Sequence, residues 1–416
     1  MRRIKKIAAG RRRHGVLLAW LALPASVHAA WETVPEVTLF AESDDNVLLD
    51  PVAEQSASRM ALDAALRLSN FNERGNVFIE PRFVTDAYSG DDTDEFESDE
   101  LFFNAGGDYR WRTVGAGFRS RYSDQSVLNS EFVGVAPGDP DLDPGDDFVD
   151  PDTGRVETFS EDRELFDIRG NLDFQISERN ELRIEMRRQS VDYSGSQQSS
   201  FRSDFDDSSV ALALIRQSDD RNTITARMIV SEFNADSTGN ATDSFGLEGI
   251  FARTLGPTLR LMITAGVQRN EFSFIQQPSL TRVENADTHS TFGVRLRKRA
   301  ERANWNVDYS QRVQPNGNGY LVVRDNIRAY GDYQFSPRLT FQFGIRYTTT
   351  EPVGTNAQIK RDYTRAELGV EWALKETMIL FAGYNGIDQE FGPADQAASN
   401  SFLVGLTYRG RSRQGR

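Results

Sequence analysis

The residues of this sequence that could do chemistry are mostly arginines and carboxylates. The chain of 416 residues holds 48 Lys and Arg, 62 Asp and Glu, three His and no Cys. The absence of Cys excludes disulfides and thiolate metal sites. A Ser-His-acid hydrolase would need His289 beside a nucleophile. The adjacent Ser290 should point to the opposite face of a strand. We therefore expect no enzyme activity and no cofactor.

A run of aspartates among Pro and Gly residues, in a predicted loop over residues 124–160, is the strongest candidate for a metal site. Their carboxylates could bind Ca²⁺, or lie near lipopolysaccharide bridged by divalent ions. The spacing is not that of an EF-hand, and the composition favours a solvated acidic loop over a metal site. The loop is also long enough to fold inward as a constriction or lid. The candidate ligands are Asp139, Asp141, Asp143, Asp146, Asp147, Asp150 and Asp152.

Many charged residues recur at alternate positions, on the face opposite to the apolar side chains. Within a wide barrel they would line a lumen that water enters. They could pair across strands and only keep the wall wet, or create a field that selects anions, because Arg presents fixed donors to carboxylates and phosphates. The predicted lining residues are Arg119, Arg121, Arg169, Arg183, Arg227, Arg260, Arg295, Arg297, Arg324, Arg328, Arg346, Glu367 and Glu371.

The elements that would position these residues are β-strands. From Val37 onward, segments of about ten residues alternate apolar and polar side chains, the period of a strand. In one of them Leu172 and Phe174 alternate with Asn171 and Asp173. Short connections, such as the one near 72–75, alternate with longer ones, such as 44–57, 88–98, 275–287 and 386–399. Eight short and nine long connections predict 18 strands, and this alternation is typical of a transmembrane outer-membrane barrel with short periplasmic turns and long extracellular loops.

Aromatic residues near strand ends suit the interfacial girdles of such a barrel, although β propensity alone also favours them. They are Tyr109, Trp111, Trp305, Tyr309, Tyr333, Phe335, Tyr347, Trp372, Tyr384 and Tyr408. Two residues depart from the pattern. Pro81 would delete a donor within a strand, which predicts a bulge. Asp325 falls on the predicted lipid face. Either it lies above the membrane band, or the predicted alternation of this strand is shifted by one residue.

Residues 1–29 read as a cleaved secretory signal, with a basic start, an apolar stretch over 15–23 and small residues before Ala29. A retained signal anchor is the alternative, but the apolar stretch is short for a bilayer. Cleavage would take the formal net charge from −14 to −21, because seven basic residues leave. We predict one barrel domain over residues 30–409 and a short basic periplasmic tail over residues 410–416.

Composition excludes other classes of protein. A mean hydropathy of −0.52 argues against a bundle of membrane helices. A pI near 4.9 argues against nucleic-acid partners. The 27 Phe, 12 Tyr and 5 Trp argue against disorder.

Three short motifs resemble the β-barrel porin 2 group of outer-membrane proteins, and barrels associated with exopolysaccharide and exosortase systems. Residues 42–47, Glu-Ser-Asp-Asp-Asn-Val, resemble the group's opening motif. Residues 177–182 and 336–341 resemble its recurrent turn, in which Ser-x-Arg leads into a strand. The closing strand departs from the usual ending, because eight residues follow Tyr408.

The pattern and the resemblance together lead to one expected function and two alternatives. We expect an integral outer-membrane channel or export conduit, and the resemblance implies an exopolysaccharide or another extended, anionic solute. The alternatives are a structural or interaction barrel with a blocked lumen, and an outer-membrane hydrolase. Expected partners are outer-membrane lipid, lipopolysaccharide, the barrel-assembly machinery and polysaccharide-export components.

Overall fold

The computed structural model describes residues 31–90, 96–127, 161–195, 202–235, 238–276, 281–353, 360–391, 395–410 and 413–414. The predicted signal peptide and the aspartates of the 139–152 segment lie outside these ranges. The strands are β1 Trp31–Asp44, β2 Ala57–Asn72, β3 Gly75–Ser89, β4 Phe96–Trp111, β5 Val114–Ser126, β6 Glu161–Ser177, β7 Asn180–Gly195, β8 Phe205–Gln217, β9 Asn222–Ala235, β10 Asn240–Gly256, β11 Leu259–Gln276, β12 Thr281–Arg299, β13 Ala303–Pro315, β14 Leu321–Ser336, β15 Leu339–Pro352, β16 Arg361–Lys375, β17 Met378–Phe391, β18 Asp395–Arg409 and β19 Arg413–Gln414.

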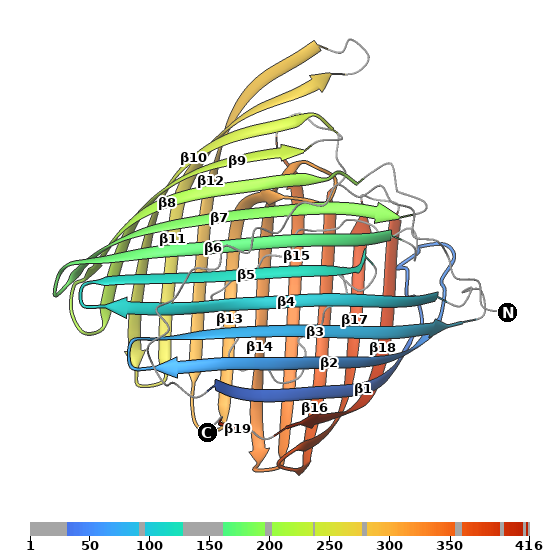
Figure 1. Ribbon diagram of the computed structural model, residues 1–416. Coiled ribbons are helices and arrows are strands. Elements are labelled where there is room, and N and C mark those ends of the chain that lie inside the picture. Colours follow the sequence, from blue (N-terminus) through green and yellow to red (C-terminus); the bar gives the residue numbers. More distant parts are fainter. Residues whose placement is uncertain are drawn as a thin grey trace.

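The strands form a closed antiparallel transmembrane barrel, as the sequence predicted. Each strand from β1 to β17 pairs with the next one along the chain, and β1 pairs with β18 from Glu36↔Arg409 to Asp44↔Ser401. In Figure 1, β2 to β7 form the near wall and β13 to β18 the far wall. Closure gives the backbone groups of the first and last strands their partners, as a sheet in lipid requires.

Connections divide the barrel into two rims. Two to four residues join β2–β3, β4–β5, β6–β7, β8–β9, β10–β11, β12–β13, β14–β15 and β16–β17, which defines the short-turn rim. The other nine connections lie at the opposite end, the loop rim. Two predicted loops are wrong in extent, because strand pairing continues through most of 275–287 and 386–399. The outward side chains of these segments are mostly polar, which hid the strand pattern, although the hydrogen-bonded pairing continues.

The outward face carries an apolar belt. Leu172, Phe343 and Val267 face outward and are exposed, whereas residues one position away face the lumen. All ten predicted girdle aromatics take the outward phase. Near the loop rim, Tyr309 and Tyr384 form hydrogen bonds of 2.7 Å to Asp325 and Asn400 of the adjacent strands. These contacts mark where the belt meets polar surroundings.

Both departures from the pattern are now explained. The predicted bulge at Pro81 is wrong: Ala65↔Arg82 and Leu68↔Ile79 share one register, and only the pairs between them are missing. A proline without an N–H therefore interrupts the ladder but does not shift it. Asp325 does face outward, at the level of Gln311 and Thr349, above Ile327. The predicted phase was correct, and Asp325 lies at the upper edge of the belt.

Four short turns share one local structure. A side-chain oxygen accepts hydrogen bonds from the backbone N–H groups two and three residues later, as in Asx and Ser turns. The accepting residues are Asn72, Ser177, Asp219 and Ser336, and an arginine stands two residues after each. In the third turn, the Asn222 side chain and the Arg221 N–H hold the pKa of Asp219 below its ordinary value. The recurrent Ser-x-Arg motif is thus a turn-forming device.

The β11–β12 hairpin rises beyond the rest of the loop rim (Figure 1). β12 pairs with β11 over its whole length but with β13 only from Phe292 to Arg299. The edge of β12 over residues 281–291 therefore has no strand pairing on that side. The backbone N–H groups of Ala286 and Thr288 instead donate to the side chains of Asn285 and Asp287, at 2.8 and 2.7 Å.

The chain after β18 continues along β1. The Gly410 N–H donates to the Pro35 carbonyl at 2.7 Å, and β19 pairs with Glu32 and Thr33. The described part of the predicted tail, residues 410 and 413–414, is therefore tied to the short-turn rim. No helix within the described ranges is long and apolar enough to cross a membrane.

Replacing Ile263 with Arg tests the phase of the barrel wall. Ile263 lies on the outward face between Phe251 and Val294. A charge there should lower the free energy of unfolding by about 2–4 kcal/mol, measured by urea titration in phospholipid vesicles. Arg260→Ile is the control, since Arg260 takes the lumen phase and is exposed near the short-turn rim. It should change that free energy by about 0.5 kcal/mol or less. The reverse ranking would contradict the assignment of faces.

Candidate functional site

Arginines form a continuous path along one lumen wall. Cross-strand pairing places Arg260 of β11 beside Arg297 of β12, and Arg295 lies two residues further along β12 on the same face. Arg295 is opposite Asp308 of β13, which is opposite Arg328 of β14. Arg328, Arg346 and Arg365 then lie side by side on β14, β15 and β16. We call Arg260, Arg297, Arg295, Arg328, Arg346 and Arg365 the arginine track.

The arginines of the track differ in their partners. Arg328 donates to Asp308 at 3.0 Å, and Arg365 pairs with Glu367 and donates to Asn385 at 2.9 Å. Arg346 stands between Arg328 and Arg365 and is exposed, although it faces the lumen. Within the described ranges, its guanidinium has no hydrogen bond or ion pair. Water therefore reaches Arg346 from inside the barrel, and its donors are available to a solute.

A second row of arginines lies on the opposite wall. Arg119 of β5, Arg169 of β6 and Arg187 of β7 are cross-strand neighbours. The step from β6 to β15 is nine strands, half of the 18 in the ring, so this row faces the track across the lumen. Asp167, 1% exposed, accepts from Arg169 at 3.1 Å and from Arg187 at 2.9 Å. Arg119 is exposed to the lumen.

The other predicted lining residues also take the lumen phase, and most of them are paired. Arg183 donates to Asp173 at 2.7 Å, and Arg227 bridges Glu185 and Glu248. Glu371 accepts a hydrogen bond of 3.0 Å from Gln342. Arg121 is the cross-strand neighbour of Asp167, and Arg324 of Arg312 and Thr350. The wall of β6–β10 is therefore largely compensated in charge, and the track is richer in arginine than in carboxylate.

Sequence reasoning missed Arg361, which lies above the track on β16. Its guanidinium sits between the rings of Tyr363 and Phe391, at 5.0 and 5.2 Å from their centroids, and donates to Gln389 at 2.9 Å. Arg361 was missed because it is the first residue after the predicted loop over 350–360, at the very end of the predicted strand. An aromatic residue two positions after an arginine, on the same face, was the available signal.

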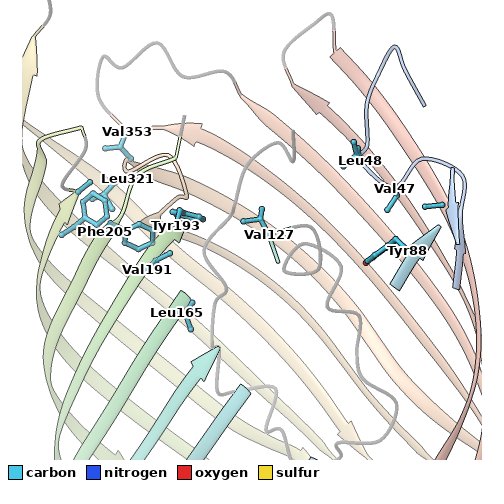
Figure 2. Close-up of a cluster of buried hydrophobic side chains, with 13 residues drawn as sticks. Val47, Leu48, Tyr88, Val127, Leu165, Val191, Tyr193, Phe205, Leu321 and Val353 are labelled. Carbon is cyan, nitrogen blue, oxygen red and sulfur yellow. The ribbon is translucent and has the colours of Figure 1, made fainter. Parts of the chain in front are cut away.

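Apolar side chains gather inside the loop rim, where alternation predicted polar ones. Leu165, Val191, Tyr193 and Phe205 are buried on the lumen face of β6–β8. Figure 2 shows Val127 between this group and Val47, Leu48 and Tyr88 on the other side. Val127, the one described residue of this connection before residue 161, therefore lies within the barrel mouth. This cluster narrows the mouth with apolar surface.

The candidates for metal binding and catalysis differ in what the structure describes of them. Asp139, Asp141, Asp143, Asp146, Asp147, Asp150 and Asp152 all fall outside the described residues. Across the ranges that the structure does describe, no three His, Asp or Glu side chains group as a metal site. His289 approaches Asp287 at 3.3 Å, whereas the Ser290 hydroxyl lies 3.3 Å from the Gln311 Oε1 on the outward face.

Comparisons with known proteins give similar solved structures but no family. No family model and no curated protein matches it. Among solved structures, Pseudomonas aeruginosa OccK7 (OpdD) shows 9% identity and a TM-score of 0.46, covering 92% of this chain and 99% of that one. Acinetobacter baumannii OccAB4 shows 13% identity and a TM-score of 0.45, covering 92% and 98%. At these values the likeness does not extend to a solute, and the β-barrel porin 2 resemblance stays a prediction.

Replacing Asp167 with Asn tests whether the compensated wall depends on its carboxylates. The substitution leaves Arg169 and Arg187 without the buried charge that they share. It should lower the free energy of unfolding by about 3 kcal/mol, measured by urea titration in vesicles. Glu271→Gln is the matched control, because its pair with Arg269 is more than 60% exposed on both sides. That change should stay within about 1 kcal/mol. Equal effects would show that Asp167 is not needed for wall stability.

Proposed function

We propose that this protein is an outer-membrane channel that passes anionic solutes along the arginine track. The observation that carries the proposal is Arg346, a lumen-facing guanidinium that is exposed and flanked by two further arginines. Guanidinium groups present paired donors that match carboxylate and phosphate geometry. Rings and rows of Arg in a pore wall favour anions. The arginine track runs from the short-turn rim into the half of the wall that is nearer the loop rim. This length suits an extended solute with repeated charges.

The two rims differ in charge, because the loop rim is acidic whereas the charges of the short turns balance. Six of the eight short turns carry an exposed arginine: Arg74, Arg112, Arg179, Arg221, Arg302 and Arg338. Outward residues at the loop rim are mostly acidic: Asp99, Asp124, Glu164, Asp206, Glu232, Asp243, Asp325, Asp362 and Asp388. The short turns also carry six exposed carboxylates, Glu73, Glu178, Asp219, Asp220, Glu301 and Glu376, which balance these arginines. An anionic solute would therefore meet repulsion at the loop rim but no net charge in the short turns.

A structural barrel with a blocked lumen is the second candidate. The apolar cluster around Val127 inside the loop rim favours it, because an apolar constriction excludes water and ions. An outer-membrane hydrolase has the least support, because Ser290 and His289 point to opposite faces of β12. Conductance in a planar bilayer separates a channel from a blocked barrel.

The proposed location follows from the belt and the rims. The apolar belt and its girdles suit a lipid bilayer, with the short turns in the periplasm and the loops outside. Lipopolysaccharide and phospholipid would then surround the belt. The barrel-assembly machinery would insert the chain, and polysaccharide-export components would deliver the solute.

The reversal potential across a salt gradient tests anion preference. In planar bilayers the protein should prefer chloride to potassium. The Arg119→Ala/Arg346→Ala double variant should shift the reversal potential towards cations, because it removes one lumen-exposed guanidinium from each of the two facing rows. Arg269→Ala is the control, since Arg269 faces outward and pairs with Glu271 at 2.9 Å. An unchanged reversal potential in a conducting double variant would refute the role of the arginines.

Cysteine labelling tests the orientation, and the chain provides a background free of Cys. Val52 is 91% exposed in the β1–β2 connection, and Glu178 is exposed in a short turn. A membrane-impermeant maleimide should label Val52→Cys on intact cells. It should label Glu178→Cys only after the outer membrane is permeabilised. The opposite result would invert the assigned topology.

A further inference from the structure

The chain that leaves β1 turns into the barrel mouth and does not extend away from it. Asn46, Val47, Leu48 and Leu49 are 1%, 4%, 8% and 3% exposed, although they belong to a connection at the loop rim. Val47 and Leu48 join the apolar cluster that contains Tyr88 and Val127 (Figure 2). Leu49 joins a second group, with Tyr363, Ile387 and Ala397. Three consecutive aliphatic side chains thus leave solvent and pack inside a largely polar lumen.

Hydrogen bonds to β18 hold this segment in place. The Asn46 Nδ2 donates to the carbonyls of Asp50 and Ala398, both at 3.0 Å, and the Asn46 Oδ1 accepts from the Asp50 N–H at 3.1 Å. Asp45 accepts from the N–H and the side-chain amide of Asn400, at 2.6 and 3.0 Å. Asp44 accepts from the Ser399 hydroxyl at 2.7 Å. These hydrogen bonds join the end of β1 and the first loop to β18, or connect Asn46 with Asp50 within the loop.

Leu49 has an unusual backbone conformation. Its φ is +51°, in the left-handed region that residues with a Cβ seldom adopt. The Leu49 N–H donates to the Asn46 carbonyl at 3.0 Å, which closes a tight turn. A non-glycine residue in this region stores strain that surrounding contacts must offset. Here those contacts are the anchoring by Asn46 and the packing of the Leu49 side chain against the wall.

The place where Leu49 packs connects it with the arginine track. Tyr363 lies on β16 between Arg361 and Arg365, on the same lumen face. Arg365 is the last arginine of the track. Arg361 lies beyond Tyr363 on the same strand, nearer the loop rim. Ile387 is the cross-strand neighbour of Arg365 on β17. Leu49 therefore covers the wall immediately beyond the end of the track.

From this arrangement we infer that residues 44–50 form a latch, which closes the outer end of the arginine track and must release for solute to pass. The inference rests on the proposed channel function and adds a gate to it. The latch is held by hydrogen bonds of Asp44, Asp45 and Asn46 to β18, by a bond of 2.9 Å from the Val47 N–H to the Gln55 carbonyl, and by two apolar groups. The hydrogen bonds between Asp45 and Asn400 are exposed at the rim, and solvent-exposed hydrogen bonds are typical of segments that open locally without unfolding the whole protein.

A reversible cross-link tests the latch, because the chain has no Cys of its own. In the Leu49→Cys/Ile387→Cys variant, oxidation should join the first loop to β17 and hold the latch closed. Single-channel conductance should be lost on oxidation and recovered on reduction. The Leu49→Cys single variant, treated identically, should conduct in both conditions. A cross-link that fails to form, or one that forms without lowering conductance, would overturn the latch.

A second variant loosens the latch without a cross-link. Asn46→Ala removes the amide that ties the loop to Ala398, so the open fraction should rise by about fivefold, the effect of losing about 1 kcal/mol of hydrogen bonding. Asn72→Ala is the matched control, because Asn72 makes similar contacts in a short turn at the other rim. An unchanged open fraction in Asn46→Ala would contradict the latch. A protein that conducts in none of these variants would instead overturn the channel itself, and its gate with it.

Discussion

The pairing of β1 with β18 is the contact on which the other features of this protein depend. Lipid offers no partner to a free strand edge, so the sheet must close on itself. Closure fixes which residues face inward, because side chains alternate along every strand. It also sets strands from distant parts of the chain opposite one another, such as β6 and β15. The two arginine rows exist as facing walls only because nine residue pairs join the first strand to the last.

The sequence alone was sufficient for those features that depend on neighbouring residues. Alternation showed that Leu172 and Phe343 face lipid and that Arg169 and Arg346 face the lumen, since a strand has a period of two. Turn chemistry is equally local: Ser177 and Ser336 each bond to backbone two and three residues away. Counting short and long connections then gave 18 strands. These signals do not require knowledge of which strands pair or of the register in which they pair.

Features that depend on register and on tertiary contacts could not be predicted in this way. Arg328, Arg346 and Arg365 are far apart along the chain, and only the hydrogen-bonded register of β14–β16 makes them neighbours. Pro81 suggested a bulge, because local reasoning cannot show that pairing resumes unshifted on both sides. Leu49 depends on tertiary contacts in the same way: it lies in the predicted loop over 44–57, and only the fold shows that it packs against Tyr363 and Ile387 in the lumen.

The raised hairpin of β11 and β12 has a consequence for how this molecule behaves among its neighbours. The N–H of Arg299 points to the β11 side, where it bonds to Thr258. Alternation then directs the N–H groups of Ala286 and Thr288 to the unpaired side of β12. A bare strand edge of this length is a template on which another chain can extend the sheet. The side chains of Asn285 and Asp287 occupy both groups, and the adjacent carboxylates repel an approaching strand. The projecting hairpin is thereby protected against intermolecular sheet growth and aggregation.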